Sequence, residues 1–179
     1  MIFVGIDPGL SGAIARIQSG SVEIYDIPTL QVAKNRREVD AKELVTLLRT
    51  MRARLQWESL GATPSSWALT DVEPRIIVGL EKVHSMRGQG VASTFAFGRV
   101  YGTLIGALSA LSLPYELTTP QAWHKTMLAG MPKGKDSSIQ RCHELFPEVH
   151  CITKKKHHNR ADALLIAEHM RRIAGGVSE

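Results

Sequence analysis

Three acidic residues stand where an acid is costly to place without a partner. Asp7 and Glu81 each end a short apolar run, and Asp162 lies at the start of the apolar face of the last amphipathic segment. If the two runs are neighbouring strands and the last segment is a helix packed across their ends, the three carboxylates meet at one edge of a sheet. The pattern therefore predicts a cluster of like charges.

Carboxylates held close together raise one another's pKa, so such a cluster is stable mainly when a divalent cation lies between them. Oxygen ligands suit Mg²⁺ or Mn²⁺, and two ions about 4 Å apart can activate a water and stabilise the leaving oxygen in phosphodiester cleavage. Taken singly, each acid also has a structural explanation. Asp7 before Pro-Gly fits a turn, Glu81 fits a surface acid, and Asp162 fits the first turn of a helix.

The elements that must position these acids follow from the spacing of apolar residues. Turn residues stop the first strand at Asp7, and the first three strands are expected to form an antiparallel meander. The predicted elements are strands over 2–6, 12–17 and 21–27, a helix over 40–55, a loop over 61–73, a strand over 75–80, helices over 91–113 and 121–128 around a short strand in 114–120, and helices over 136–145 and 161–173.

This order predicts an α/β fold with a mixed sheet and helices packed on its faces, folded as a single domain over residues 1–179. The RNase H-like fold of the retroviral-integrase superfamily, a mixed five-stranded sheet flanked by helices, has this order. Other α/β folds share parts of it, so the order alone does not separate them.

Composition sets the class of protein. Hydrophobic residues make up 44% of the chain and the net charge is +5, which excludes wholesale disorder and leans towards a polyanionic partner. The longest apolar stretch is broken by glycine and polar residues, so no membrane span is expected. Two cysteines are too few for a disulfide scaffold, and the apolar run before Asp7 is too short for a signal peptide, so a reducing cytoplasm is expected.

Four groups of residues extend the acid pattern. They are 6–12 (Ile-Asp-Pro-Gly-Leu-Ser-Gly), 81–84 (Glu-Lys-Val-His) with 88–90 (Gly-Gln-Gly) and 97–99 (Phe-Gly-Arg), 119–123 (Thr-Pro-Gln-Ala-Trp), and 160–167 (Arg-Ala-Asp-Ala-Leu-Leu-Ile-Ala). In this order they resemble the RuvC family of Holliday junction resolvases, most closely its phage-type and related bacterial branch, over nearly the whole chain.

The resemblance implies a homodimeric, magnesium-dependent, structure-selective endonuclease of DNA recombination and repair. Such an enzyme nicks two opposing strands of a four-way junction and leaves 5′-phosphate and 3′-hydroxyl ends. It would work in the cytoplasm of a bacterial or phage-infected cell.

Matched position by position, the resemblance makes Asp7, Glu81 and Asp162 catalytic metal ligands. The family places a fourth Asp or His three or four residues before the last acid, where this chain has Asn159 and His158. Histidine binds transition metals and acts as a general base near neutral pH, so His158 is preferred as the fourth catalytic and metal-binding residue. Asn159 and His157 stay as alternatives.

Basic residues bracket the expected site and are candidate DNA contacts. They are Lys133, Lys135, Lys154, Lys155, Lys156 and Arg160, together with His84 and Arg87 in the loop that follows Glu81. The resemblance puts that loop at the junction centre, where His84 or Met86 could wedge against an unstacked base. Solvated surface lysines and an ordinary surface loop are the alternatives.

Glycine recurs every four residues at 98, 102 and 106 of the predicted helix over 91–113. Such a stripe of small residues lets another backbone approach closely. It fits either a dimer interface or packing on the protein's own sheet.

Two other functions remain open. A non-catalytic junction-binding module of the same fold would explain the missing fourth carboxylate. A phosphotransfer enzyme of the actin and sugar-kinase type would explain residues 7–12, which resemble the first phosphate loop of those enzymes. The latter normally close two such domains around ATP, and this chain has the length of one.

Overall fold

A mixed five-stranded sheet forms the centre of the protein. The computed structural model describes residues 1–59, 75–84, 88, 90–134 and 136–176, with the backbone alone for 53–59. The strands of the sheet are β1 (Ile2–Asp7), β2 (Ala13–Gln18), β3 (Ser21–Asp26), β6 (Ile76–Glu81) and β7 (Tyr115–Thr118), in the order β3-β2-β1-β6-β7. The first three are antiparallel, whereas β6 is parallel to β1 and to β7, so the predicted meander and strands are confirmed.

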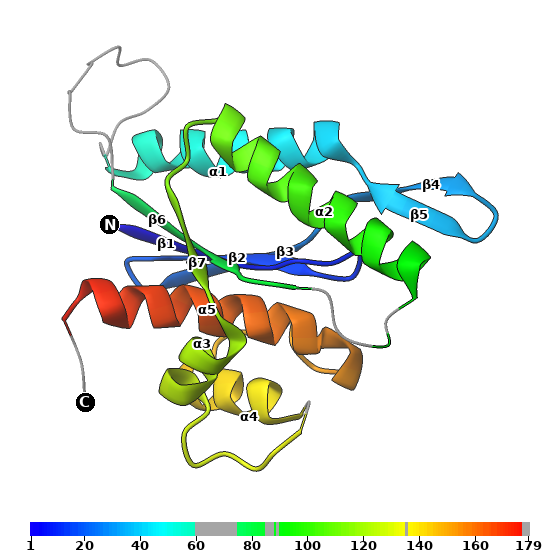
Figure 1. Cartoon of the computed structure of the whole chain (residues 1–179). Helices are drawn as coiled ribbons and strands as arrows, with labels where there is room; N and C mark the ends of the chain where they lie inside the picture. Colours follow the sequence, from blue (N-terminus) through cyan, green and yellow to red (C-terminus); the bar gives the residue numbers. More distant parts are fainter. Residues whose placement is uncertain (60–74, 85–87, 89, 135, 177–179) are drawn as a thin grey trace.

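Helices cover both faces of this sheet, as Figure 1 shows. On one face lie α1 (Ala41–Ser59) and α2 (Val91–Ala110); on the other lie α5 (His158–Ala174) and, beyond it, α3 (Pro120–Met127) and α4 (Asp136–Leu145). The predicted helices are confirmed, although α5 begins three residues earlier than expected, after a 3₁₀ turn over Lys155–His157. The predicted loop over 61–73 lies outside the described residues.

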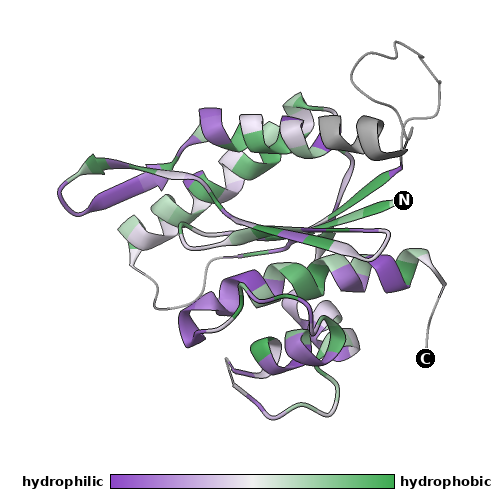
Figure 2. Cartoon of the chain, turned by 180° about the vertical axis from the view of Figure 1, so that it is seen from behind, coloured by the Kyte–Doolittle hydropathy of each residue, from purple (hydrophilic) through white to green (hydrophobic). Residues whose placement is uncertain are grey.

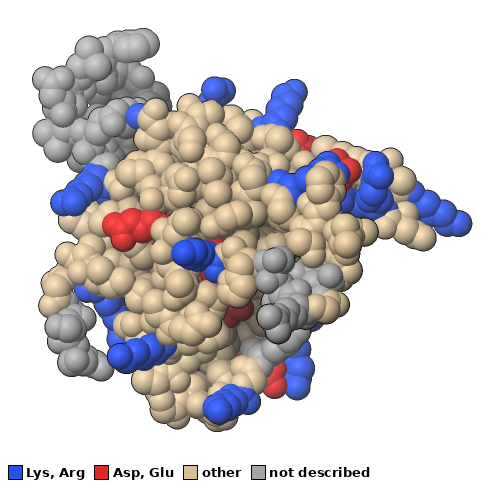
Figure 3. Space-filling model, in the orientation of Figure 1, with Lys and Arg blue, Asp and Glu red and all other residues tan. Residues whose placement is uncertain are grey.

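A two-stranded hairpin was not expected from the sequence. Strands β4 (Thr29–Ala33) and β5 (Arg36–Val39) pair with each other and project from the sheet beside α2 (Figure 1). The alternation of apolar residues is weak here because four polar residues, 34–37, interrupt it. Figure 3 shows lysine and arginine side chains gathered over this projecting end.

The alternation of the strands divides the core between the two faces. Val4 and Ile6 of β1 pack with Leu80 of β6 under α1 and α2. Phe3 of β1 and Ile77 of β6 instead face α5. Figure 2 shows hydrophobic residues along these central strands, as expected for strands covered on both sides.

A pair of glycines lets α5 lie directly on the sheet. Gly5 of β1 and Gly79 of β6 are register neighbours on the α5 face. A Cβ added to Gly5 would lie 2.1 Å from the carbonyl oxygen of Ala163, and one added to Gly79 would lie 2.6 Å from Cγ of Met170. At Gly5 the obstacle is the backbone of α5, so only glycine allows this close approach, which fixes the height of α5 above the strand ends.

The glycine stripe of α2 does not pack on the sheet. A Cβ added at Gly98, Gly102 or Gly106 would meet no atom within 4 Å, and each of the three glycines is exposed. The side of α2 that faces the sheet carries Val100, Leu104, Ala107 and Leu108. Packing on the protein's own sheet is therefore the wrong explanation of the stripe.

The apolar surface of α2 has a second consequence. Among the described residues, α2 is the one helix that is long and apolar enough, by length and composition alone, to cross a membrane. Its inner side nevertheless packs in the core against β1 and β6. Its outer side is left as an exposed, largely apolar face.

Candidate active site

The three acids predicted from the sequence lie at one edge of the sheet. Asp7 and Glu81 end the neighbouring parallel strands β1 and β6, whose register pairs Ile6 with Leu80. Each acid lies two residues beyond one of the glycines under α5, so strand alternation turns both carboxylates towards that helix. Asp162 immediately precedes Ala163, whose carbonyl oxygen approaches Gly5.

The pKa values of these acids show that they act on one another. Burial raises the pKa of Asp7 well above its ordinary value, and the negative charges of Asp162 and Glu81 raise it further. Burial is also the largest cause of the raised pKa of Glu81, to which Asp162 adds. Part of each acid remains exposed, so the site is accessible from solvent.

The chemistry of the donors fits a hard divalent cation. Three carboxylates supply only oxygen ligands, which is the set that Mg²⁺ and Mn²⁺ prefer. Across the described parts of the chain, no three His, Cys, Asp or Glu side chains already stand in an arrangement to hold one ion. The mutual effects on pKa and the absence of a preformed ligand group are compatible. Two carboxylates influence each other's pKa when they are about 4–6 Å apart, whereas each ligand atom of a shared ion must lie about 2 Å from that ion. Side-chain rotation would have to bring the oxygens together.

Trp123 orients the Glu81 carboxylate. It lies on α3, which begins with Pro120 after the N-cap Thr119, whose hydroxyl accepts a hydrogen bond from the Ala122 amide at 3.2 Å. The indole is buried in the core under α5, and its Nε1 donates to Oε1 of Glu81 at 2.9 Å. This hydrogen bond favours the ionised carboxylate and opposes the rise of its pKa.

Sequence reasoning did not assign a role to this tryptophan. Trp123 lies in the motif at residues 119–123, and the N–H group of a buried indole normally finds a hydrogen-bond acceptor. That rule would have indicated that Trp123 bonds a nearby acid or carbonyl group, although not which one.

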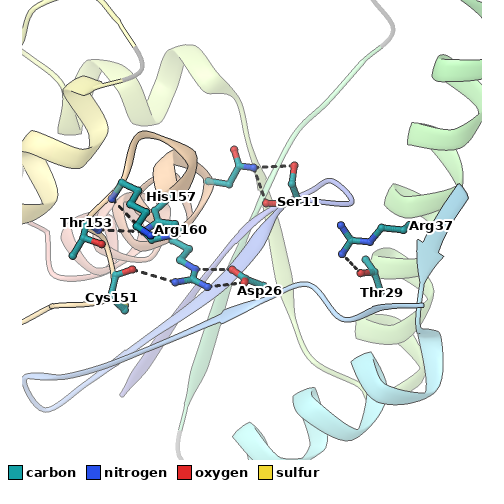
Figure 4. A network of polar contacts seen from close by, with 10 residues as sticks. Ser11, Asp26, Thr29, Arg37, Cys151, Thr153, His157 and Arg160 are labelled. Carbon is teal, nitrogen blue, oxygen red and sulfur yellow. Dashed lines mark hydrogen bonds and ion pairs between the residues drawn. The ribbon is translucent and has the colours of Figure 1, made fainter. Parts of the chain in front are cut away.

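His158 and Asn159, the candidates for the fourth metal ligand, both make hydrogen bonds within the protein. His158, the first residue of α5, is one helical turn before Asp162, and its Nδ1 lies 3.1 Å from the carbonyl oxygen of Lys155. The Asn159 amide donates to the backbone oxygen of Ser11 at 2.6 Å and to its hydroxyl at 3.1 Å, which ties α5 to the loop after Asp7 (Figure 4).

His157 has a local role in the turn before α5. Its Nδ1 accepts the backbone N–H groups of Thr153 at 3.2 Å and Lys154 at 3.3 Å (Figure 4). Burial and the neighbouring positive charges, Arg160 and Lys156 first among them, lower its pKa. These bonds give His157 a structural role in the turn, whereas His158 lies within α5, one helical turn before Asp162, so His158 remains the preferred prediction of a fourth ligand.

Two of the candidate DNA contacts, Arg160 and Lys155, form ion pairs within the protein. Arg160 forks onto Asp26 with two bonds of 2.6 Å, which lower the pKa of Asp26, and also donates to the carbonyl oxygen of Cys151 at 3.1 Å (Figure 4). Arg160 therefore clamps the start of α5 to the end of β3. Lys155 pairs with Asp136 at 3.0 Å in an exposed ion pair of the kind that contributes little.

The other candidates are simpler. Lys133, Lys154, Lys156 and His84 are exposed. Lys135, Met86 and Arg87 lie outside the described residues.

Solved structures, but neither family models nor curated proteins, resemble this chain. No protein-family model matches the chain, and no curated protein matches it. Among solved structures, Thermus thermophilus RuvC in complex with Holliday junction substrate is similar over 98% of this chain and 96% of that one, with a TM-score of 0.55 and 17% identity. A second Thermus thermophilus RuvC structure covers 97% of both chains, with a TM-score of 0.53 and 16% identity. The chain thus has the RNase H-like fold of these RuvC structures, with the three acids at the edge of its mixed five-stranded sheet.

Proposed function

We propose that this chain is a metal-dependent, structure-selective endonuclease that resolves four-way DNA junctions by paired, symmetric nicks, leaving 5′-phosphate and 3′-hydroxyl ends. The observation that carries the proposal is the meeting of Asp7, Glu81 and Asp162, from β1, β6 and α5, at one edge of an RNase H-like sheet. A structure with the same fold was solved in complex with a Holliday junction substrate, which supports branched DNA as the substrate.

Each residue has a distinct part in this proposal. Asp7, Glu81 and Asp162 would hold Mg²⁺ or Mn²⁺, which supplies charge neutralisation at the phosphate and a water activated for attack. Trp123 holds the Glu81 carboxylate in place. His158 donates from Nδ1 to the Lys155 carbonyl, so Nε2 is the nitrogen left to accept a proton from the attacking water or to bind a metal.

A non-catalytic junction-binding module is the second candidate. The chain has His158 and Asn159, and so no carboxylate, four and three residues before Asp162, and the amide of Asn159 bonds to Ser11. A module that kept the fold and the basic residues would bind junctions without cutting them.

Incubation with a labelled four-way junction separates these candidates. We expect Mg²⁺ or Mn²⁺ to support two opposed nicks and EDTA to abolish them, with Mn²⁺ at least as effective as Mg²⁺ if His158 is a ligand. Binding is measured in EDTA against duplex DNA of the same sequence, at a salt concentration that weakens nonspecific contacts. Tight junction binding without cleavage in either metal would favour the non-catalytic module, and equal affinity for duplex would favour a general nuclease.

Paired nicks require two active sites, so the proposal includes a homodimer. The exposed face of α2 is the candidate interface, because Val91 and Phe95 are 87% and 69% exposed on the same helix as the open glycine stripe. Residues spaced by three or four lie on one side of a helix, and large exposed apolar faces mark protein interfaces. A second copy could approach closely along the glycines and cover Phe95.

The variant Phe95→Glu tests this interface. We expect it to shift the protein from dimer to monomer in analytical ultracentrifugation, raising the dimer dissociation constant at least about tenfold, and to replace paired nicks by single ones. Ile173→Glu is the matched control, because Ile173 is 55% exposed on α5, outside the α2 face. An unchanged sedimentation coefficient for Phe95→Glu would rule out this face as the interface.

A further inference from the structure

A small hollow between the β4–β5 hairpin and α2 is lined by arginines. Its volume is about 90 Å³, and Arg36 and Arg37 of β5 and Arg99 of α2 line it together with Glu38. Leu10 also lines it, three residues after Asp7 in the loop that leaves β1. The hollow therefore lies beside the loop that follows Asp7.

The charge in this hollow is unbalanced. Glu38 accepts two bonds from Arg99, at 3.0 Å and 2.5 Å, and also lies 3.5 Å from Nε of Arg36. Arg37 donates to the hydroxyl of Thr29 across the hairpin. Among the residues that line the hollow, three guanidinium groups face one carboxylate, so the lining carries a net charge of +2.

Within the described part of the chain, donors of these side chains remain beyond those that bond Glu38 and Thr29, and they point to an anionic ligand. Each guanidinium carries five N–H donors in a planar fork, and Glu38 and Thr29 accept only a few of them. This fork matches the geometry of a phosphate group. Arg36 and Arg37 are exposed and so can be reached by a large ligand.

The position of the hollow selects the ligand. It lies on the α2 side of the strand-end acids, whereas the candidate lysines 154–156 lie at the start of α5 on the other face of the sheet. Figure 3 shows basic side chains gathered at the end of the molecule where Figure 1 shows the β4–β5 hairpin. A DNA strand that lies across the acids towards the hairpin would meet these arginines next.

We propose that this hollow binds a backbone phosphate of the DNA on the hairpin side of the acids, with Arg36 and Arg37 as its main contacts. This inference rests on the proposed function, because the same DNA is the substrate. It assigns the hairpin to DNA binding, a role that none of the contacts expected from the sequence covers.

The test is the salt dependence of DNA affinity for R36Q/R37Q in EDTA, with a fluorescent four-way junction as the probe. We expect the affinity to fall about tenfold near 0.1 M salt, and the slope of log affinity against log salt to become shallower by about 0.9, which is the contribution of one neutralised phosphate. R36K/R37K keeps the charge and is expected to keep the slope. R49Q/R75Q is the matched control, because it removes two exposed arginines that do not line the hollow.

The outcomes separate the two proposals. Suppose that the wild-type protein binds the junction and that R36Q/R37Q has the same salt slope and affinity as the wild type or as R49Q/R75Q. The hollow is then not a phosphate site, and the proposed function is unaffected. If the wild-type protein binds neither junction nor duplex, both proposals fall. Melting curves of all variants check that the hairpin change leaves the fold intact.

Discussion

Replacement of Asp7 by asparagine is expected to abolish junction cleavage, by about 10³-fold or more, while junction binding stays unchanged. The amide keeps the size of the side chain but removes the negative charge that a divalent cation needs. The basic residues that would neutralise phosphates are left intact, so affinity for the junction in EDTA should not fall. Single-turnover cleavage and equilibrium binding, measured on the same preparation, check both parts.

The same variant is expected to be more stable than the wild-type protein in metal-free buffer. The pKa of Asp7 is raised on folding, so over the interval from its ordinary value of 3.8 upwards the folded chain binds more protons than the unfolded chain. The free energy of unfolding therefore falls as the pH rises through that interval. The asparagine side chain carries no charge to repel Asp162 and Glu81, so at neutral pH the melting temperature should rise, and added Mn²⁺ should stabilise the wild-type protein but not the variant.

Asp26→Asn is a control that is expected to change the melting temperature in the opposite direction. Asp26 also ends a strand, but its pKa is lowered, first by the hydrogen bonds from Arg160. Its carboxylate therefore stabilises the folded state above its ordinary pKa and loses that effect as the pH falls. Asp26→Asn should lower the melting temperature. If Asp7→Asn instead lost junction binding together with cleavage, or lowered the melting temperature as Asp26→Asn does, the assignment of Asp7 to a metal site would be wrong.

The positions of Asp7 and Glu81 follow from local sequence patterns, because each of these acids ends an apolar strand. An apolar run stopped by Asp-Pro-Gly defines the end of β1 at Asp7, and a second apolar run defines the end of β6 at Glu81. The alternation of side chains then decides which face each carboxylate lies on. Gly5 and Gly79 add a close approach that is visible in the sequence only as two glycines in strands, and that becomes meaningful once the two strands are known to pair in register.

The parts that the sequence did not predict depend on contacts between distant segments. The bond from Trp123 to Glu81 joins residues 42 positions apart, and the bond from Asn159 to Ser11 joins residues 148 apart. The type of a side chain indicates that a buried donor needs an acceptor, but it does not indicate which of the many acceptors the fold brings close. The hairpin was missed for a different reason, since its strands are mostly exposed and so carry little apolar alternation.

Trp123→Phe is expected to lower the cleavage rate about 10- to 100-fold at neutral pH, the usual range for removing a group that orients a metal ligand. Phenylalanine keeps an aromatic ring in the core but has no N–H to donate to Oε1 of Glu81. Because that bond lowers the pKa of Glu81 against the effects of burial and Asp162, its loss raises this pKa. More of Glu81 is then protonated at a given pH, so the acidic limb of the pH–rate profile should move to higher pH.

The pH profile distinguishes this orienting role from a loss of packing. Trp123 is 1% exposed, so a smaller ring also leaves space in the core and lowers stability by about 1–3 kcal/mol. Met127→Ala is the matched control. Met127 is buried in the same core and on the same helix as Trp123, but it has no N–H group in its side chain to donate to Glu81. It should lower the melting temperature without moving the acidic limb. A Trp123→Phe profile with the wild-type limb and a uniformly lower rate would mean that the indole only fills space, whereas a shifted limb recovered by higher Mn²⁺ concentration would tie the tryptophan to the ionisation of Glu81.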